Sequence, residues 1–388
     1  MLDGVNVALG VTGSVAAVKT VELAHELRRE GAAVRGVVTE GATGIVHPWA
    51  VEFATDEPVV TELTGAVEHV ALCGTDGWAD VLLIAPATAN TVGKVAAAVD
   101  DTPVTTCATT ALGAGLPVVV APAMHEPMYD HPGVLDAIER LEGWGVRFVD
   151  PRVEEGKAKI AAPSAIATEV GRAAGDRPLS GRRVVVTSGA TTESIDPVRV
   201  LSNRASGRTG RAVARACYVR GADVTLVHDG PDVPYADVRA VESAAEMREA
   251  ALVATADADA LVSAAAISDF TVETRPEKIS SGEPLTLDLH PAPKLLDAIR
   301  EERPDLTMVG FKVETSGDDA MVAAARRIAD RVDLAFVVAN DASVMGEAET
   351  RALLVREGTV DEYAGPKARL GARVADELVA ELAAGDGG

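Results

Sequence analysis

Apolar runs of strand length alternate with amphipathic segments along the first half of the chain. Between the runs at 5–11 and 33–39, segment 15–31 has helical spacing and ends at a glycine. The predicted strands of this half are 5–11, 33–39, 79–88, 117–124 and 145–150, with a further helix over 90–99. Strands that alternate with helices predict a parallel sheet covered on both faces.

The second half restarts the same alternation without repeating the sequence. Its predicted strands are 182–189, 222–228, 258–266, 306–312 and 333–340, with helices near 207–221, from about 243, and over 318–330. The Gly, Pro and polar residues of 173–181 are typical of a joint between domains. We therefore expect two doubly wound, Rossmann-like α/β domains at 1–175 and 182–388, with a linker at 176–181.

Composition narrows the possible partners and the environment. The chain has 388 residues and a formal net charge of -23, and only 8 of its 36 basic residues are lysine. A diffuse acidic excess disfavours nucleic acid and anionic membranes as partners, and such acid-rich, lysine-poor surfaces are typical of proteins from salt-loving organisms. The three cysteines form neither a disulfide framework nor a metal motif, and neither a bilayer-spanning run nor a signal peptide is apparent. We expect a cytoplasmic protein.

The loop Gly10–Ser14 follows the first strand and opens a helix. Its glycines allow a ligand to approach the backbone closely, and the hydroxyls of Thr12 and Ser14 suit a phosphate. The loop lacks the dinucleotide pattern, and Thr39, not an acidic residue, follows the second strand, so a mononucleotide fits better than NAD. A tight turn without a ligand explains the loop equally well.

Two further segments, each at the end of a predicted strand, resemble motifs of a known enzyme family. With "APATANTVGK" (85–94) and "APAMHEPMYDHP" (121–132), residues 4–160 resemble the flavin-containing cysteine decarboxylases. They are most similar to the flavodoxin-like decarboxylase half of the bifunctional phosphopantothenoylcysteine decarboxylase/phosphopantothenate–cysteine ligases. The resemblance implies a catalytic role for His69, and oxidation of the substrate thiol by FMN before carbon dioxide leaves. It implies FMN binding by Gly10, Thr12, Gly13, Ser14, Thr39, Pro86, Ala87, Thr88 and Asn90.

Two features depart from that family pattern. His125 stands where the substrate clamp usually has Asn after "PAM", so we expect His125 and Met128 to form a clamp with altered chemistry. The flap at 151–164 lacks the cysteine that bacterial members use as a proton donor. Lys157, Lys159 or Glu155 could replace it, and the sequence leaves the choice open.

A second glycine-rich loop, Thr187–Gly210, follows the first strand of the second half. Its hydroxyls and backbone N–H groups suit a phosphate, although it has no Walker pattern. A structural role accounts for the glycines alone, but not for Asn203 and Ser206 so near Arg199 and Arg204.

Seven ordered segments make residues 181–380 similar to the phosphopantothenate–cysteine ligase domain of the same family. They are "TSGATTESIDPVR", "SNRASGRTG", "AAAISDF", "PEKI", "APKLL", "GFKVET" and "VAND". The resemblance implies that CTP activates the carboxylate of phosphopantothenate as an acyl-cytidylate, that cysteine then attacks, and that Mg²⁺ neutralises the phosphates. It implies catalytic roles for Asn203 and Lys278, and leaves metal ligands unassigned.

The resemblance also implies a nucleotide site. Its residues are Gly189, Ala190, Thr191, Ala264, Ala265, Ala266, Asp269, Lys278, Pro293, Lys294, Leu295, Leu296, Phe311, Arg327 and Arg331. The last two are arginines where bacterial members have lysines, so a planar guanidinium group replaces the compact charge of an ammonium group. The preference for CTP over ATP rests on few contacts.

The two halves together predict consecutive steps of coenzyme A synthesis, ligation and then decarboxylation to 4′-phosphopantetheine. The family further implies a homo-oligomer, with trimers of the flavin domain and dimers of the ligase domain, and hence a dodecamer. Two alternatives remain open at this stage. One is a flavin-dependent decarboxylase of another thiol with a degenerate second domain, and the other is a flavin-binding regulatory subunit without decarboxylase chemistry.

Overall fold

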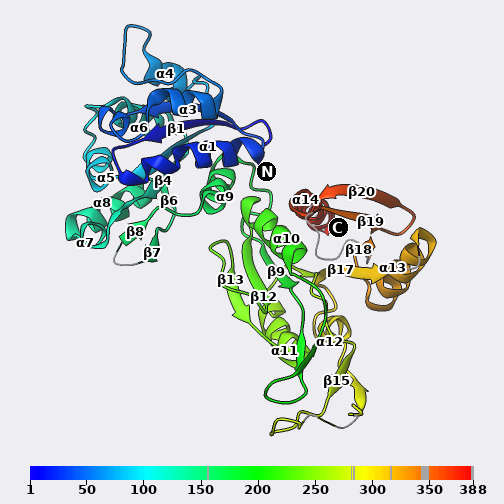
Figure 1. Ribbon diagram of the computed structural model, residues 1–388. Coiled ribbons are helices and arrows are strands. Elements are labelled where there is room, and N and C mark those ends of the chain that lie inside the picture. The colour runs from blue at the N-terminus through cyan, green and yellow to red at the C-terminus, as the bar shows by residue number, and fades with distance from the viewer. Residues whose placement is uncertain (155–156, 281, 283–284, 315–316, 342–348, 386–388) are drawn as a thin grey trace. The chain divides into compact units, whose positions relative to one another are not determined.

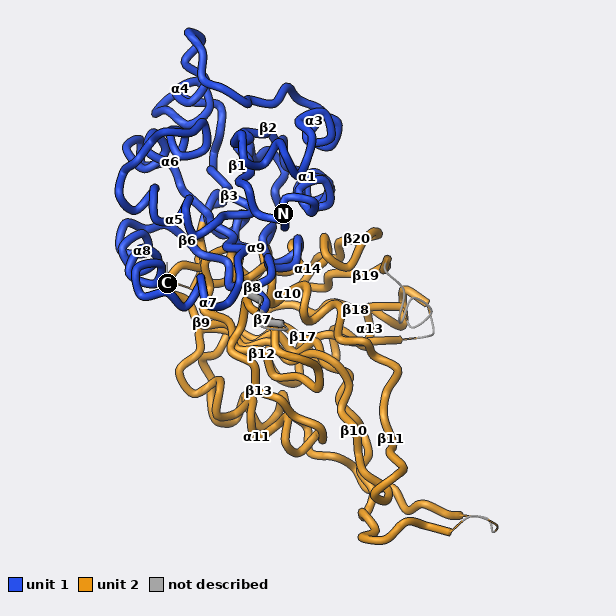
Figure 2. The backbone as a smooth tube through the Cα atoms, turned by 60° about the vertical axis from the view of Figure 1, so that its left-hand side comes forward, with its two compact units in different colours: residues 1–176 blue, residues 177–388 orange. Residues whose placement is uncertain are grey.

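The computed structural model describes residues 1–154, 157–280, 282, 285–314, 317–341 and 349–385. The chain divides into two compact units, Met1–Asp176 and Arg177–Gly388 (Figures 1 and 2). Each unit is built around its own sheet, which is parallel in unit 1 and mixed in unit 2, and around its own hydrophobic clusters. Among the described residues, no helix is both long and apolar enough to cross a bilayer.

Unit 1 contains a five-stranded parallel sheet with the order β2-β1-β3-β4-β6. Its strands are β1 (Asn6–Val11), β2 (Ala33–Val38), β3 (Val81–Ala87), β4 (Val118–Pro122) and β6 (Arg147–Phe148). The helical elements are η1 (Val15–Lys19), α1 (Thr20–Arg29), α2 (Glu40–Thr43), α3 (Pro48–Thr55), α4 (Glu68–Cys73), α5 (Ala89–Ala96), α6 (Pro103–Ala114), α7 (Glu126–Tyr129), α8 (Pro132–Gly143) and α9 (Pro163–Ala174). This flavodoxin-like order confirms the predicted fold class for the first half.

Burial on both faces explains why the unit 1 strands read as continuous apolar runs. Every residue of β3 is buried, and alternate side chains along it enter different hydrophobic clusters. Leu83 packs with helices α1 and α9 on one face, whereas Leu82 and Ile84 pack with α6 and α8 on the other. The carboxyl ends of β1, β3 and β4 therefore meet at one edge of a sheet that is covered on both sides.

Unit 2 contains an eight-stranded sheet with the order β13-β12-β9-β14-β17-β18-β19-β20. Its strands are β9 (Arg183–Ser188), β12 (Asp223–His228), β13 (Asp237–Ala240), β14 (Ala260–Ser263), β17 (Thr307–Glu314), β18 (Phe336–Asp341), β19 (Glu349–Val355) and β20 (Val360–Pro366). Six neighbouring strands are parallel in the Rossmann order, which confirms the prediction, and β19 and β20 extend the sheet antiparallel to their neighbours.

The helices of the described part of unit 2 cover both faces of this sheet. They are α10 (Arg208–Val219), α11 (Ala244–Thr255), α12 (Leu295–Glu302), α13 (Asp318–Val332) and α14 (Lys367–Gly385). Helices α10 and α14 pack on one face, which we call the α10–α14 face, and α11, α12 and α13 cover the other. The α10 and α14 backbones approach closely, because a Cβ added at Gly371 would lie 2.5 Å from the carbonyl carbon of Ala212.

Three small sheets complete the described structure. In unit 1, β5 (Met124–His125) pairs with β8 (Lys157–Lys159), which pairs with β7 (Arg152–Glu154). In unit 2, β10 (Thr192–Ser194) pairs with β11 (Val200–Ser202), and β15 (Phe270–Val272) pairs with β16 (Leu289–Pro291). All these pairings are antiparallel, and each connects segments that flank a candidate site.

Candidate active sites

At the sheet edge of unit 1, the Thr12 side chain joins the loops that follow β1 and β3. Thr12 is 1% exposed; its hydroxyl donates to the Pro86 carbonyl oxygen at 2.8 Å and accepts from the Thr88 N–H at 3.1 Å. The Thr12 N–H also donates to Pro86 O, and the Ala85–Pro86 peptide bond is cis. The Thr12 hydroxyl is therefore committed to the protein, and this geometry favours a positioning role for it.

The rest of the predicted flavin loop lies at the same edge. The Ser14 hydroxyl caps η1 by accepting from the Ala16 N–H and donates to Ala123 O, so it ties the β1 loop to the segment after β4. A Cβ added at Gly13 would lie 3.0 Å from the Gly41 carbonyl carbon, which explains why a glycine is needed there. Thr39, at the end of β2, donates its N–H to Val11 O. Four strand ends thus converge on one small region.

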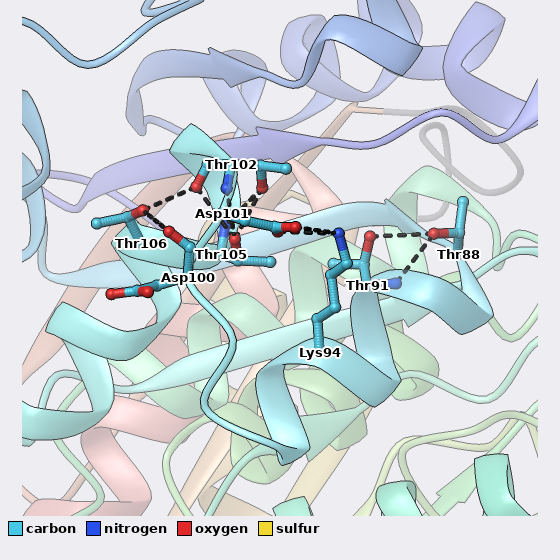
Figure 3. A network of polar contacts seen from close by, with 8 residues as sticks. All are labelled: Thr88, Thr91, Lys94, Asp100, Asp101, Thr102, Thr105 and Thr106. Carbon is cyan, nitrogen blue, oxygen red and sulfur yellow. Dashed lines mark hydrogen bonds and ion pairs between the residues drawn. The ribbon is translucent and has the colours of Figure 1, made fainter.

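Helix α5, which follows the β3 loop, is held by a polar network (Figure 3). Thr88 caps the helix by accepting from the Thr91 N–H, and the Lys94 ammonium contacts both carboxylate oxygens of Asp101 at 2.9 and 2.7 Å. Thr102 and Thr105 form a capping box at the start of α6. These contacts fix the direction in which α5 leaves the edge, and Asn90 in its first turn is exposed.

His69 lies in the short helix α4, which starts after Val67. Its Nδ1 is buried and has no hydrogen-bond partner within the described residues. The neighbouring Glu68 instead accepts from the Thr64 N–H and hydroxyl, and these hydrogen bonds lower the pKa of Glu68. The imidazole is thus left uncommitted by the part of the chain that the structure describes.

The predicted clamp and flap belong to one small sheet. His125 pairs with Lys157, and β7 with β8 forms the hairpin of the predicted flap. His125 and Met128 are exposed. Of the three candidate proton donors, Glu155 lies outside the described residues, Lys157 is described only in its backbone, and Lys159 is half-buried with an interaction partner.

In unit 2, residues from segments far apart in the sequence line one cavity of about 500 Å³. Of the predicted site, the lining includes Gly189, Asn203, Ala264, Ala265, Ala266, Asp269, Pro293, Lys294, Leu295, Leu296, Phe311 and Arg331. The Asn203 side chain donates to Ala266 O at 2.9 Å, so the loop before α10 is tied to the segment after β14. The structure therefore brings together residues that are up to 142 positions apart in the sequence.

The hydroxyls of the Thr187–Gly210 loop connect the loop to itself and to the segment after β14. The Ser188 hydroxyl donates to Gly207 O, Thr187 Oγ1 accepts from the Ala265 N–H, and Thr191 Oγ1 accepts from the Ser268 N–H. Gly189 has a φ of +83°, and a Cβ there would collide with the Asp229 carboxylate. The loop's hydroxyls thus help to shape the cavity, and phosphate binding by this loop stays a prediction.

Four predicted nucleotide residues are not part of the cavity lining found in the described structure. They are Ala190, Thr191, Lys278 and Arg327. Ala190 and Thr191 are buried behind the lining, and Ala190 forms a β-bridge with Ala266. Lys278 is exposed on the segment after β15.

Arg199 joins that segment to the first loop through Asp196. The Asp196 carboxylate accepts from the N–H groups of Val198, Arg199 and Ile279, and pairs with the Arg199 guanidinium, which also donates to Ile279 O. Burial opposes ionisation of Asp196, but these hydrogen bonds prevail and lower its pKa to about 2. Arg199 therefore helps to hold Ile279, the neighbour of Lys278, in place. This contact gives Arg199 a structural role.

Ion pairs between described residues lie in the lining. Lys294 pairs with Asp269, and Arg331 contacts both oxygens of the Asp297 carboxylate at 2.8 and 2.9 Å. Both pairs are about half exposed, so solvent screens them and they can exchange for a ligand's charges. No cluster of three or more His, Cys, Asp or Glu side chains suited to a metal occurs among the described residues.

Several lining residues were absent from the predicted site, including three from the last part of the chain. Asn340, at the end of β18, Thr350, in β19, and Lys367, at the start of α14, all line the cavity. Thr350 and Lys367 carry no local motif, and they reach the cavity only because β19 and β20 run antiparallel and return the chain to this edge. Asn340 belongs to the "VAND" segment of the ligase resemblance, and this was the only sequence signal that could have pointed to one of these three residues.

Comparisons with known proteins agree with this division of the chain. Residues 1–174 match the family model described as Flavoprotein, and residues 179–383 match the model described as DNA/pantothenate metabolism flavoprotein C-terminal domain.

Full-length relatives cover both units. The coenzyme A biosynthesis bifunctional protein CoaBC of Thermococcus kodakarensis is 46% identical over 362 residues, which cover 91% of this chain and 89% of that one. The protein of the same name from Methanocaldococcus jannaschii is 34% identical and covers 97% and 94%. A solved structure, the FMN binding protein AtHal3, is 30% identical, covers 42% of this chain and 94% of its own, and has a TM-score of 0.38.

Proposed function

This chain belongs to the CoaBC family of bifunctional coenzyme A biosynthesis proteins, phosphopantothenoylcysteine decarboxylase and phosphopantothenate–cysteine ligase in one chain, and we propose that it uses CTP and FMN for these two reactions. The observation that carries the proposal is the cavity of unit 2. Asn203, Ala264–Ala266, Asp269, Pro293–Leu296 and Phe311 come from separate segments of the ligase resemblance and line the same space.

In the ligase reaction, the carboxylate of 4′-phosphopantothenate attacks the α-phosphate of CTP and pyrophosphate leaves. The amine of cysteine then attacks the acyl carbon, CMP leaves, and the amide forms with loss of one proton. Asn203 lies beside the β14 segment, held by its hydrogen bond to Ala266 O, where it would orient the acyl-cytidylate. Arg331 would face the triphosphate by exchanging its pair with Asp297, and Mg²⁺ would be held mainly by the phosphates.

For the decarboxylase reaction, the residues at the sheet edge of unit 1 fit FMN. Gly13 leaves no room for a Cβ against the Gly41 backbone, so the loops after β1 and β2 lie close together at this edge, and Asn90 presents an exposed amide. Bound FMN would supply a two-electron acceptor for the substrate thiol. His69, with an unpartnered Nδ1, would take a proton from the substrate, and His125 would donate a hydrogen bond to it.

We also propose that the protein is a homo-oligomer that works in the cytoplasm. Val15, Val18, Trp49 and Phe53 are exposed apolar residues of unit 1, between 59% and 80% accessible, and such side chains mark interaction surfaces when they gather. A reducing compartment suits Cys73, Cys107 and Cys217, which are all buried and free.

The test gives the purified protein 4′-phosphopantothenate, cysteine, Mg²⁺ and either CTP or ATP, and follows pyrophosphate and carbon dioxide separately. We expect both products, with CTP preferred, and a yellow preparation that releases FMN on denaturation. Carbon dioxide from phosphopantothenoylcysteine without any pyrophosphate from the ligase mixture would contradict the ligase assignment. A preparation that neither contains nor binds FMN would contradict the flavin assignment.

A further inference from the structure

The His69 imidazole lacks the kind of hydrogen bond that usually orients a reactive histidine. Its Nδ1 is buried and finds no partner among the described residues. In most sites of this kind, a hydrogen bond at one ring nitrogen fixes the direction in which the other nitrogen points. The direction of the His69 ring therefore depends on the placement of helix α4, which carries it.

Helix α4 is firmly attached at its carboxyl end. The Ala79 N–H donates to Leu72 O at 2.9 Å. Leu72 and Cys73 are buried, and the Cys73 thiol interacts with the thiol of Cys107 in α6. These contacts fix the last turn of α4, and the first turn, which contains His69, needs an attachment of its own.

The first turn of α4 begins at a strained residue. Val67, directly before the helix, has a φ of 56° and a ψ of 47°. This left-handed conformation is unfavourable for a β-branched side chain, and Val67 is the only β-branched residue with a positive φ in the described part of the chain. Its side chain is 44% exposed, so burial of the valine does little to offset the strain. Strain of this kind persists where the surrounding structure holds it, and it is concentrated at functional sites.

Hydrogen bonds between Thr64 and Glu68, which we call the Thr64–Glu68 clasp, span this turn. The Glu68 carboxylate accepts from the Thr64 N–H at 2.8 Å and also from the Thr64 hydroxyl. The hydroxyl, and after it the N–H, lower the pKa of Glu68 and so favour its ionised form. Residues 64–67 are all exposed, so packing contributes little to holding them and the clasp takes over that task.

We infer that the Thr64–Glu68 clasp holds the strained turn at Val67 and thereby positions the His69 imidazole for decarboxylation. This inference rests on the proposed role of His69 in unit 1. His69 directly follows Glu68, so a turn that relaxed at Val67 would shift the start of α4 and redirect the ring. Thr64 and Glu68 are positioning residues, because they act on the substrate only through His69. A misplacement of a reacting group by about 1 Å can cost about 100-fold in rate.

The experiment is a double-mutant cycle on the full chain, in which Glu68→Ala is made both with Val67 present and together with Val67→Gly. Glycine adopts a positive φ without strain, so the turn then no longer needs the clasp. With Val67 present, we expect Glu68→Ala to lower the kcat of carbon dioxide release about 10- to 100-fold, while KM and flavin content change less than about threefold. In the Val67→Gly background, the same substitution should lower kcat less than about threefold.

Hydrogen exchange of the backbone amides of 68–74, followed by mass spectrometry, tests the clasp without turnover. With Val67 present, Glu68→Ala should make these amides exchange about 5- to 30-fold faster, and in the Val67→Gly background less than about threefold faster. The matched control is Glu22→Gln, which removes an exposed carboxylate that pairs with Lys19 near the start of α1. Both measurements should be unchanged in this control.

The outcomes separate this inference from the proposed function. Equal effects of Glu68→Ala in the two backgrounds would overturn the inference, because strain at Val67 would then have no part in them. Full activity and unchanged exchange in Glu68→Ala would also overturn it. Glu68→Gln removes the charge but keeps one acceptor for the clasp, so a loss as large as that of Glu68→Ala would overturn the inference in favour of an electrostatic role. If the unmodified protein releases no carbon dioxide but exchange follows the expected pattern, the clasp is supported and the decarboxylase activity is contradicted.

Discussion

Thr12→Val tests whether the flavin loop is held by one buried hydroxyl. The change keeps the shape of the side chain but removes the bond donated to Pro86 O and the acceptor for the Thr88 N–H. Pro86 O still accepts from the Thr12 N–H at 3.3 Å, so only the Thr88 N–H is left without its partner. A neutral hydrogen bond contributes about 1 kcal/mol and an unsatisfied buried group costs about 1–3 kcal/mol, whereas the added methyl group returns roughly 0.8 kcal/mol.

The balance is a destabilisation of about 2 kcal/mol. For a unit of 176 residues, we expect the transition temperature to fall by about 4–8 °C. The assay is flavin fluorescence during heating, because release of the cofactor reports on unit 1 alone. Flavin content after purification should fall as well, and carbon dioxide release with it, while pyrophosphate release should be unchanged.

The matched control is Thr110→Val, which removes a hydroxyl that only donates to Thr106 O within α6. Its transition should stay within about 1–2 °C of the unmodified protein, since such surface changes are usually within about 0.5 kcal/mol. If Thr12→Val releases its flavin at the same temperature as the unmodified protein, the argument that this hydroxyl joins the two loops is wrong.

Three further predictions concern His69, His228 and the surface charge. His69→Asn should lower carbon dioxide release by about 10²- to 10⁴-fold in steady-state assays and leave flavin content and pyrophosphate release unchanged; an active variant would exclude His69 as the base. Burial, and after it the charge of Arg211, lower the pKa of His228 in the folded protein. Unit 2 should therefore be fully stable above the pKa of an unfolded histidine, near 6.5, and lose stability as the pH drops below that value. Thermal melts between pH 5 and 8 would show this fall, and His228→Leu should flatten it. Raising KCl from about 0.1 to 1 M shortens the screening length from about 10 to 3 Å and should raise the melting temperature of a chain with a net charge of -23; an unchanged or lower value would contradict the salt-adapted interpretation.

The sequence predicted the central strands well because both of their faces are buried. The run 79–88, for example, contains β3, whose residues are all buried. An apolar run of this length predicts a buried strand with little ambiguity. The edge elements were harder. Strands β19 and β20 and helix α14 went unpredicted, although they form a wall of the ligase cavity, since β20 is largely exposed and its pattern is weak.

Side-chain roles were the least predictable part. A hydroxyl that binds a phosphate and one that joins two loops look the same in a sequence, and the structure uses Thr12 and Ser188 in the second way. Lys278 is a second example. The backbone beside it is fixed, because the Ile279 N–H donates to Asp196, whereas the Lys278 side chain is exposed. Only tertiary contacts decide such cases.

The pairing of β5 with β8 has an evolutionary consequence. His125 and the flap hairpin are separate motifs along the chain, yet they share backbone hydrogen bonds in one three-stranded sheet. An insertion or deletion in the hairpin would shift the register against position 125. In this family, replacement of Asn by His after "PAM" and loss of the flap cysteine should therefore be inherited together more often than chance predicts. A survey of many members that found the two changes independent would contradict that expectation.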